Sequence, residues 1–196
     1  MKIKTPFLVL EIEILFIIVI FISIFSSTFF DYILNYFICY SFILFHELSH
    51  MFMASVFGKE IDIFKFSISG VNIKFKEESN KKNINILKEI LIYIVGPFSN
   101  VFLAMLLKNN IVIFQMNLFL AFINILPIYP LDGYNILRNI FYIFFSKKKS
   151  NIILECTNKF VFIIMLVIAL LQVIFLRNPS IIIFSIYIFF INQNSK

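Results

Sequence analysis

Long apolar stretches, separated by short polar loops, recur along this 196-residue chain and constrain its fold most strongly. A helix needs about 20 apolar residues to cross the hydrocarbon part of a bilayer. The composition agrees, because 61% of the residues are hydrophobic and 14% are charged, against roughly 45–50% and about 25% in soluble domains. The sequence therefore predicts an all-α polytopic membrane protein with about six transmembrane helices. We expect the spans at residues 12–25, 32–57, 84–107, 111 to a break at Pro127 and Pro130, 160–176 and 181–191.

The basic residues are distributed unevenly between the two membrane sides that these spans define. If the N-terminus is cytosolic and the sides alternate, only Lys108 and Arg177, of 17 Lys and Arg residues, fall on the outer side. Cytosolic loops carry the excess of positive charge in membrane proteins, so we expect both termini in the cytosol. Heavy use of Ile, Phe, Asn and Lys hints at a bacterial genome rich in AT, and we expect the chain in a bacterial cell membrane. The net charge of +6 then reflects topology and lipid contact, and no nucleic-acid partner is expected.

Residues 61–77 alternate between apolar and polar side chains on both sides of a Ser69-Gly70 turn. Such alternation predicts a small membrane-associated β-hairpin, between the second and third spans, with one apolar face. Two roles remain open. The hairpin is either a loop lying on the membrane surface or an element beside the active site, whose edge pairs with an extended substrate.

The polar segments are short, and the longest, residues 76–85, is too short to fold alone. We therefore expect one integral-membrane domain over residues 1–196 and no separate soluble domain.

The second span contains His46-Glu47-Leu48-Ser49-His50, which includes both histidines of the chain. Residues four apart lie on one face of a helix, so the two imidazoles can bind one zinc ion, with Glu47 beside them as general base. Ionisable groups inside a membrane helix are costly and usually functional. The alternative is that both histidines are buried hydrogen-bonding groups without a metal.

A carboxylate follows the break in the fourth span, within residues 124–133, Asn-Ile-Leu-Pro-Ile-Tyr-Pro-Leu-Asp-Gly. Two prolines three apart cannot continue a regular helix, and irregular backbone at membrane depth is tolerated only where it is buried in protein or lines a watery cavity. Gly133 permits a tight path after the break. Asp132 is a natural third ligand, and two histidines with one carboxylate leave a zinc position open for water. The alternative is that Asp132 caps the following helix.

These motifs resemble those of the site-2 protease family of intramembrane zinc metalloproteases, peptidase family M50. A third motif, Gly96-Pro97-Phe98-Ser99-Asn100, is similar to the family's Gly-Pro-x-x-Asn signature, and all three motifs occur in the family's order. The resemblance places the catalytic core at about residues 32–145. It implies one Zn²⁺ per chain, bound by His46, His50 and Asp132, with Glu47 as the catalytic base.

The resemblance also implies hydrolysis of a peptide bond in or near a transmembrane segment of a membrane-tethered protein. The expected partners are that substrate, the lipid bilayer and membrane-embedded inhibitory or regulatory proteins. Further residues are candidates for binding the substrate or bracing the loop: Asn124, Pro127, Pro130, Gly133 and Asn100.

Six spans, a short chain and no inserted PDZ domain resemble the sporulation branch, whose founding member cleaves a membrane-tethered pro-sigma factor. One departure is the C-terminal CBS domain of that member, which has no counterpart in these residues. Two other functions remain open, a proteolytically inactive membrane regulator and a metal transporter. A transporter has no need for Glu47 between its ligands, and an inactive regulator is expected to lose Glu47 or a ligand, whereas all are present.

Overall fold

The computed structural model describes residues 2–4, 9–13, 30–67, 70–75, 86–177, 185–186 and 188–189. Most of these residues are helical. Contacts divide the chain into two units, the first formed by Met1–Ile84 with Val95–Ala121 and the second by Asn85–Ile94 with Phe122–Lys196.

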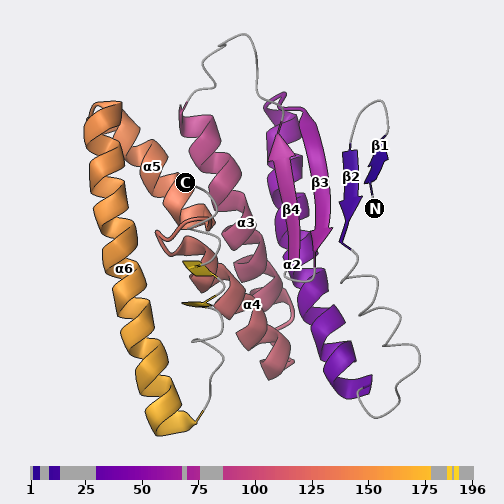
Figure 1. Cartoon of the computed structure of the whole chain (residues 1–196). Coiled ribbons are helices and arrows are strands. Elements are labelled where there is room, and N and C mark those ends of the chain that lie inside the picture. Colours follow the sequence, from indigo (N-terminus) through magenta and orange to yellow (C-terminus); the bar gives the residue numbers. More distant parts are fainter. Residues whose placement is uncertain are drawn as a thin grey trace. The chain divides into compact units, whose positions relative to one another are not determined.

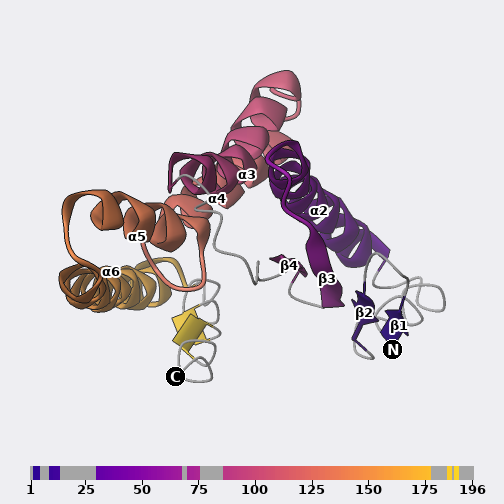
Figure 2. The ribbon, with the colours of Figure 1, turned by 90° about the horizontal axis from the view of Figure 1, so that it is seen from above.

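The first unit combines helix α2 with a four-stranded sheet (Figure 1). The helix is Phe30–Val56, and the strands are β1 (Lys2–Lys4), β2 (Val9–Ile12), β3 (Ile61–Ser67) and β4 (Gly70–Phe75). Their order in the sheet is β1-β2-β3-β4, as Figure 2 shows from above. Strands β2 and β3 are parallel, and the other two pairs are antiparallel.

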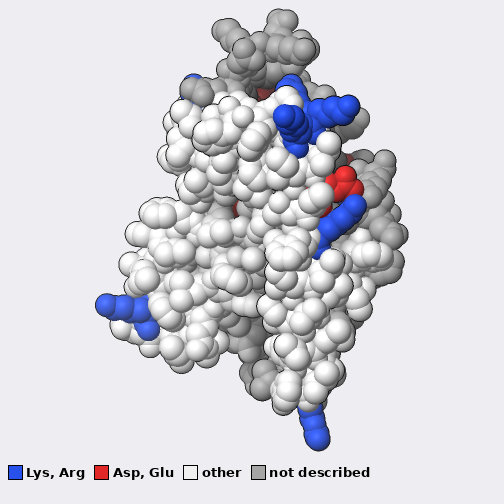
Figure 3. Space-filling model, turned by 90° about the vertical axis from the view of Figure 1, so that its left-hand side faces the viewer, with Lys and Arg blue, Asp and Glu red and all other residues white. Residues whose placement is uncertain are grey.

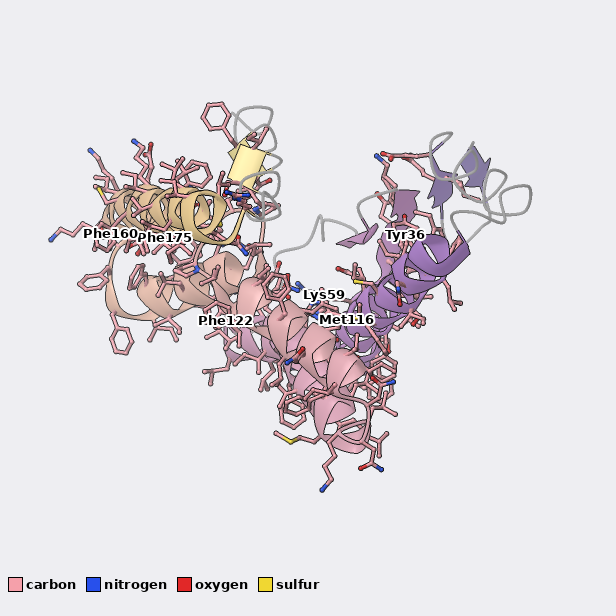
Figure 4. The ribbon with its side chains drawn as sticks, turned by 90° about the horizontal axis from the view of Figure 1, so that it is seen from below. Tyr36, Lys59, Met116, Phe122, Phe160 and Phe175 are labelled. Carbon is pink, nitrogen blue, oxygen red and sulfur yellow. The ribbon has the colours of Figure 1, made fainter. Side chains whose placement is uncertain are left out.

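The apolar face of the sheet packs on α2. Phe64 and Val71, from β3 and β4, are buried together with Tyr40 of the helix. Tyr36, labelled in Figure 4, packs against the same cluster. The antiparallel β3–β4 pair confirms the predicted hairpin strands, while the turn at residues 68–69 lies outside the described residues. The position of the hairpin relative to a membrane stays a prediction.

The two N-terminal strands were not predicted, and the expectation of an all-α chain with one hairpin is wrong on this point. Strand β2 pairs with β3 from Val9 opposite Ile63 to Ile12 opposite Phe66. Ile12 therefore ends a strand and does not begin the first span, whose residues 14–25 lie outside the described part of the chain. Short apolar runs are ambiguous because periodicity alone does not separate a buried strand from a helix.

In the described part of the chain, four further helices follow the sheet: α3 (Ile86–Leu106), α4 (Ile111–Ile125), α5 (Asp132–Phe144) and α6 (Lys147–Leu176). Helix α3 is shared, because residues 86–94 cluster with the second unit and the remainder with the first. In the second unit α5 packs against α6. Three described helices are long and apolar enough to cross a membrane, at Leu34–Val56, Ile86–Leu106 and Lys147–Phe175, and α4 is a shorter apolar helix.

These helices confirm some predicted spans and correct others. The second and third spans match α2 and α3, and α4 ends at Ile125, directly before the predicted break. The fifth span was expected from residue 160, but α6 begins at Lys147. The prediction followed hydropathy and missed a polar first half that is helical, where Lys159 and Glu155 form an ion pair one turn apart at 3.0 Å. The sixth span lies largely outside the described residues, so the count of six and the cytosolic termini stay predictions.

Large apolar side chains cover much of the described surface. On α6, Phe160 and Phe175 are 65% and 77% exposed, and Figure 4 labels both. On the face that Figure 3 shows, charged side chains gather in a few separate places with uncharged surface between them. Exposed apolar surface of this extent is unusual for a soluble monomer and is what contact with lipid requires.

Candidate metal centre

His46 and His50, the histidine pair, lie one turn apart on α2 and are buried, with 3% and 6% of their surfaces exposed. Their Nε2 atoms are 3.1 Å apart. Two nitrogens bound to one tetrahedral zinc are separated by roughly 3.3 Å, from Zn–N distances of about 2.0–2.1 Å. The donor set and its spacing therefore fit zinc. Glu47, the residue between them that the sequence predicts as base, is half-buried on the same turn.

Gly96, on α3, leaves the space that the two imidazoles occupy. A Cβ atom at this position would overlap the ring of His50 and lie 2.7 Å from Nε2 of His46. Any side chain here would therefore displace the nitrogens that face the metal position. In the sequence this glycine was recognised only as part of a motif, and its place beside the two histidines was not predicted. A Gly-Pro pair inside a predicted membrane helix was the available signal, because glycine there marks a close approach.

Asn100 lies one turn after Gly96 on α3 and is fully buried. Its side-chain amide nitrogen is 3.1 Å from Nδ1 of His46, the ring nitrogen that faces away from His50. The sequence placed Asn100 among residues that bind substrate or brace the loop, whereas the structure brings it to the back of a predicted metal ligand. His46, His50, Gly96 and Asn100 all belong to the first unit.

Asp132, in the second unit, is the first residue of α5 and is half-buried. The N-cap position is occupied by Leu131, whose side chain makes no capping hydrogen bond. The interpretation of Asp132 as the cap of this helix is therefore wrong. The helix dipole still stabilises a carboxylate in the first helical turn, but Asp132 is not the N-cap residue.

The Pro loop, residues 126–131, connects α4 to α5 and is held within the second unit. Ile128, at its centre, is fully buried against Met165 and Ile188. The backbone N–H of Tyr129 donates to Oδ1 of Asn158 on α6, at 3.1 Å. Asn158 was not singled out from the sequence, because a single asparagine on an amphipathic helix carries no signal of a partner 29 residues away.

Gly133 lets the chain return tightly on itself after the Pro loop. A Cβ atom at Gly133 would overlap the carbonyl of Ile125, the last residue of α4, and lie 2.6 Å from the carbonyl oxygen of Leu126. Asn124 is half-buried in the last turn of α4, Pro127 is half-buried and Pro130 is exposed. Their predicted roles in binding substrate or bracing the loop stay predictions.

Comparison with known protein families matches part of the chain. The family model described as Peptidase family M50 matches residues 108–168, less than a third of the chain. The matched segment holds the Pro loop and Asp132 but neither histidine. No curated protein sequence matches the chain.

Among solved structures, the site-2 protease from Methanocaldococcus jannaschii is similar, with 24% sequence identity and a TM-score of 0.67. The similarity covers 100% of this chain and 95% of that one. At this identity the likeness concerns the fold. The chain has the fold of a site-2 protease.

Proposed function

We propose that this protein is an intramembrane zinc metalloprotease that hydrolyses a peptide bond in or near a transmembrane segment of a membrane-tethered protein. The observation that carries the proposal is the convergence of two buried Nε2 atoms, 3.1 Å apart, in a helix long and apolar enough to cross a membrane. The family match over residues 108–168 and the site-2 protease fold support it.

His46, His50 and Asp132 are the zinc ligands in this proposal. All three side chains are of kinds that bind zinc, and the two histidines are already aligned within the first unit. Three protein ligands leave a fourth position open, which is the arrangement of catalytic zinc sites. When bound, zinc supplies Lewis acidity toward the scissile carbonyl and makes water nucleophilic near neutral pH.

Glu47 is the general base. Glu47 lies between the two histidines in the sequence and is half-buried, and a carboxylate at this position of a helix can reach the side of a metal bound by residues 46 and 50. The carboxylate takes a proton from the attacking water and transfers it to the leaving amine nitrogen, which completes cleavage of the peptide bond.

The substrate must present an extended segment, because a transmembrane helix hides its carbonyl groups in its own hydrogen bonds. Strand β4 is at the edge of the described sheet, and an unwound segment can pair with such an edge. Asn124, Pro127 and Pro130 then serve to contact this segment or to brace the Pro loop. By resemblance, the substrate is a pro-sigma factor of sporulation in a bacterial cell membrane.

The test is the variant Glu47→Gln, assayed on a membrane-tethered substrate in liposomes. The amide keeps the shape but cannot accept the proton, so cleavage should fall by roughly 10²–10⁴-fold. Zinc content should remain that of the wild type. The exposed Glu60, changed to Gln, is the matched control and should cleave normally.

Cleavage by Glu47→Gln at the wild-type rate would remove Glu47 from the mechanism. Zinc flux across the liposome membrane, equal in wild type and Glu47→Gln and without any cleavage, would instead identify a transporter.

A further inference from the structure

Asn100 is a fully buried amide on an apolar helix, and its side chain contacts the ring of His46, a predicted metal ligand. An amide that is transferred into an apolar environment without hydrogen bonds is destabilising by roughly 1–3 kcal/mol, judged from protein mutations. In its placed orientation Nδ2 is 3.1 Å from Nδ1 of His46, while Oδ1 is buried and has no partner. One polar atom of the amide therefore faces His46 and the other has no partner, so the contact with His46 decides which way the amide is turned.

The two nitrogens of His46 have different tasks. Nε2 lies 3.1 Å from Nε2 of His50 and therefore faces the metal position, while Nδ1 faces Asn100. A neutral imidazole carries one proton, and the nitrogen that carries it cannot offer a lone pair to a metal. If His46 is to bind zinc through Nε2, its proton must be on Nδ1, and Nδ1–H needs an acceptor.

The Asn100 side chain can supply that acceptor if its carboxamide is turned over, with no movement of the backbone. Rotating a carboxamide by 180° exchanges its oxygen and nitrogen with almost no change in shape, and the choice follows from the hydrogen bonds. With Oδ1 toward His46, the amide accepts from Nδ1–H over the same 3.1 Å separation. With Nδ2 toward His46, the amide instead directs an N–H group at Nδ1, which suits the tautomer that keeps its proton on Nε2.

We propose that Asn100 is a positioning residue whose side-chain oxygen accepts a hydrogen bond from Nδ1–H of His46 and thereby holds the tautomer that presents Nε2 to zinc. The proposal rests on the proposed function for its metal. Helix α3 then acts on the site in two ways. Gly96 leaves room for the metal-facing nitrogens, and Asn100 fixes the tautomer of one ligand. A histidine that binds metal commonly donates its other N–H to such a partner.

Two substitutions separate this role from packing alone. Asn100→Asp keeps an oxygen at the same position, so it should preserve zinc affinity. Asn100→Leu keeps the volume but removes the acceptor, and it should weaken zinc binding by roughly 10- to 100-fold. The control is Asn117→Leu, because Asn117 is also fully buried in the first unit but donates to the backbone carbonyl of Ile113, at 3.0 Å.

The measurements are zinc affinity in detergent, by competition with a chelator, and the thermal unfolding of the metal-free proteins. Loss of affinity in Asn100→Leu, with retention in Asn100→Asp and Asn117→Leu, supports the proposal. Equal loss in both Asn100 variants overturns it, since an oxygen acceptor then does not suffice. Wild-type affinity in Asn100→Leu reduces Asn100 to a packing residue and also overturns it.

A spectroscopic measurement tests the tautomer independently of zinc. The chain has two histidines, so protein labelled with ¹⁵N-histidine gives signals from two rings, which His50→Gln assigns. In metal-free wild-type protein we expect the His46 proton on Nδ1, and a mixture of tautomers in Asn100→Leu. A proton on Nε2 in the wild type refutes the inference. A wild type that binds no zinc but shows the Nδ1–H tautomer contradicts the proposed function and leaves the Asn100 contact established.

Discussion

The histidine pair and the Pro loop bring functional groups into position by different physical means. The histidine pair is on a regular helix, where the spacing of four residues alone aligns the two rings, and a neighbouring glycine gives them room. The Pro loop is irregular, and its shape depends on the burial of Ile128 and on one hydrogen bond that the backbone N–H of Tyr129 donates to the side chain of Asn158. The first arrangement follows from local geometry, whereas the second requires contacts from a distant part of the chain.

The largest expected effect comes from removing one of the histidines or the carboxylate that directly follows the Pro loop. His46→Ala and Asp132→Asn should each reduce zinc affinity by more than the roughly 10–100-fold that follows the loss of an outer-shell partner, and both should abolish cleavage. A neutral amide is a poorer ligand than a carboxylate for zinc. Metal analysis and chelator competition measure the loss. Glu155→Gln, the same change at an exposed carboxylate of α6, should have no effect.

Full zinc occupancy in Asp132→Asn would mean that the histidine pair binds zinc without the carboxylate that follows the Pro loop. Cysteines placed at Leu48 and at Leu131, in a background without Cys39 and Cys156, test whether Asp132 lies next to the histidine pair. A short cross-linker should join them if Asp132 completes the ligand set, and it should fail to do so otherwise.

The two glycines should respond differently to a single added methyl group. At Gly96 the methyl meets imidazole rings, so Gly96→Ala should strongly weaken zinc binding while the metal-free protein still folds. At Gly133 it meets backbone carbonyl groups, which cannot rotate away, so Gly133→Ala should destabilise the fold by about 1–3 kcal/mol or more. Zinc affinity and thermal unfolding of the metal-free proteins distinguish the two effects.

Gly58→Ala is the control for this pair. A Cβ at Gly58 meets nothing within 4 Å, and the backbone there has φ +77, so the variant should show only the strain of about 1–2 kcal/mol of a left-handed residue. Zinc binding by Gly96→Ala at wild-type affinity would contradict the close approach of α3 to the histidine pair.

The smallest expected effect concerns the brace of the Pro loop. Asn158→Ala removes the acceptor of the Tyr129 N–H and should cost about 1 kcal/mol, which lowers Tm by roughly 2–4 °C in a chain of this size. Asn158→Asp keeps an acceptor and should restore the wild-type value. Asn151→Ala is the control. Asn151 is also on α6, and the change removes an exposed hydrogen bond that its side chain accepts from the hydroxyl of Tyr142 on α5. Equal Tm in Asn158→Ala and wild type would mean that apolar burial alone holds the loop.

The contrast between local geometry and distant contacts also explains how much of the structure could be predicted from the sequence. The helices, the break after Ile125 and the alignment of His46 with His50 follow from periodicity, proline chemistry and helix geometry, which are local properties. Strand β2 escaped prediction because its parallel partner β3 lies about 50 residues further along the chain. The contacts of Asn100 with His46, over 54 residues, and of Asn158 with Tyr129 have no local signature either.

The position of Gly96 has a consequence for how activity is inferred among similar chains. The proposed metal site and base comprise four residues, the two histidines, Glu47 and Asp132. A chain could keep all four and still be unable to hold a metal, because one methyl group on the adjacent helix occupies the space of both imidazole nitrogens. Residue 96 therefore belongs in any criterion that separates active enzymes from inactive relatives, although it binds nothing and takes no part in the reaction.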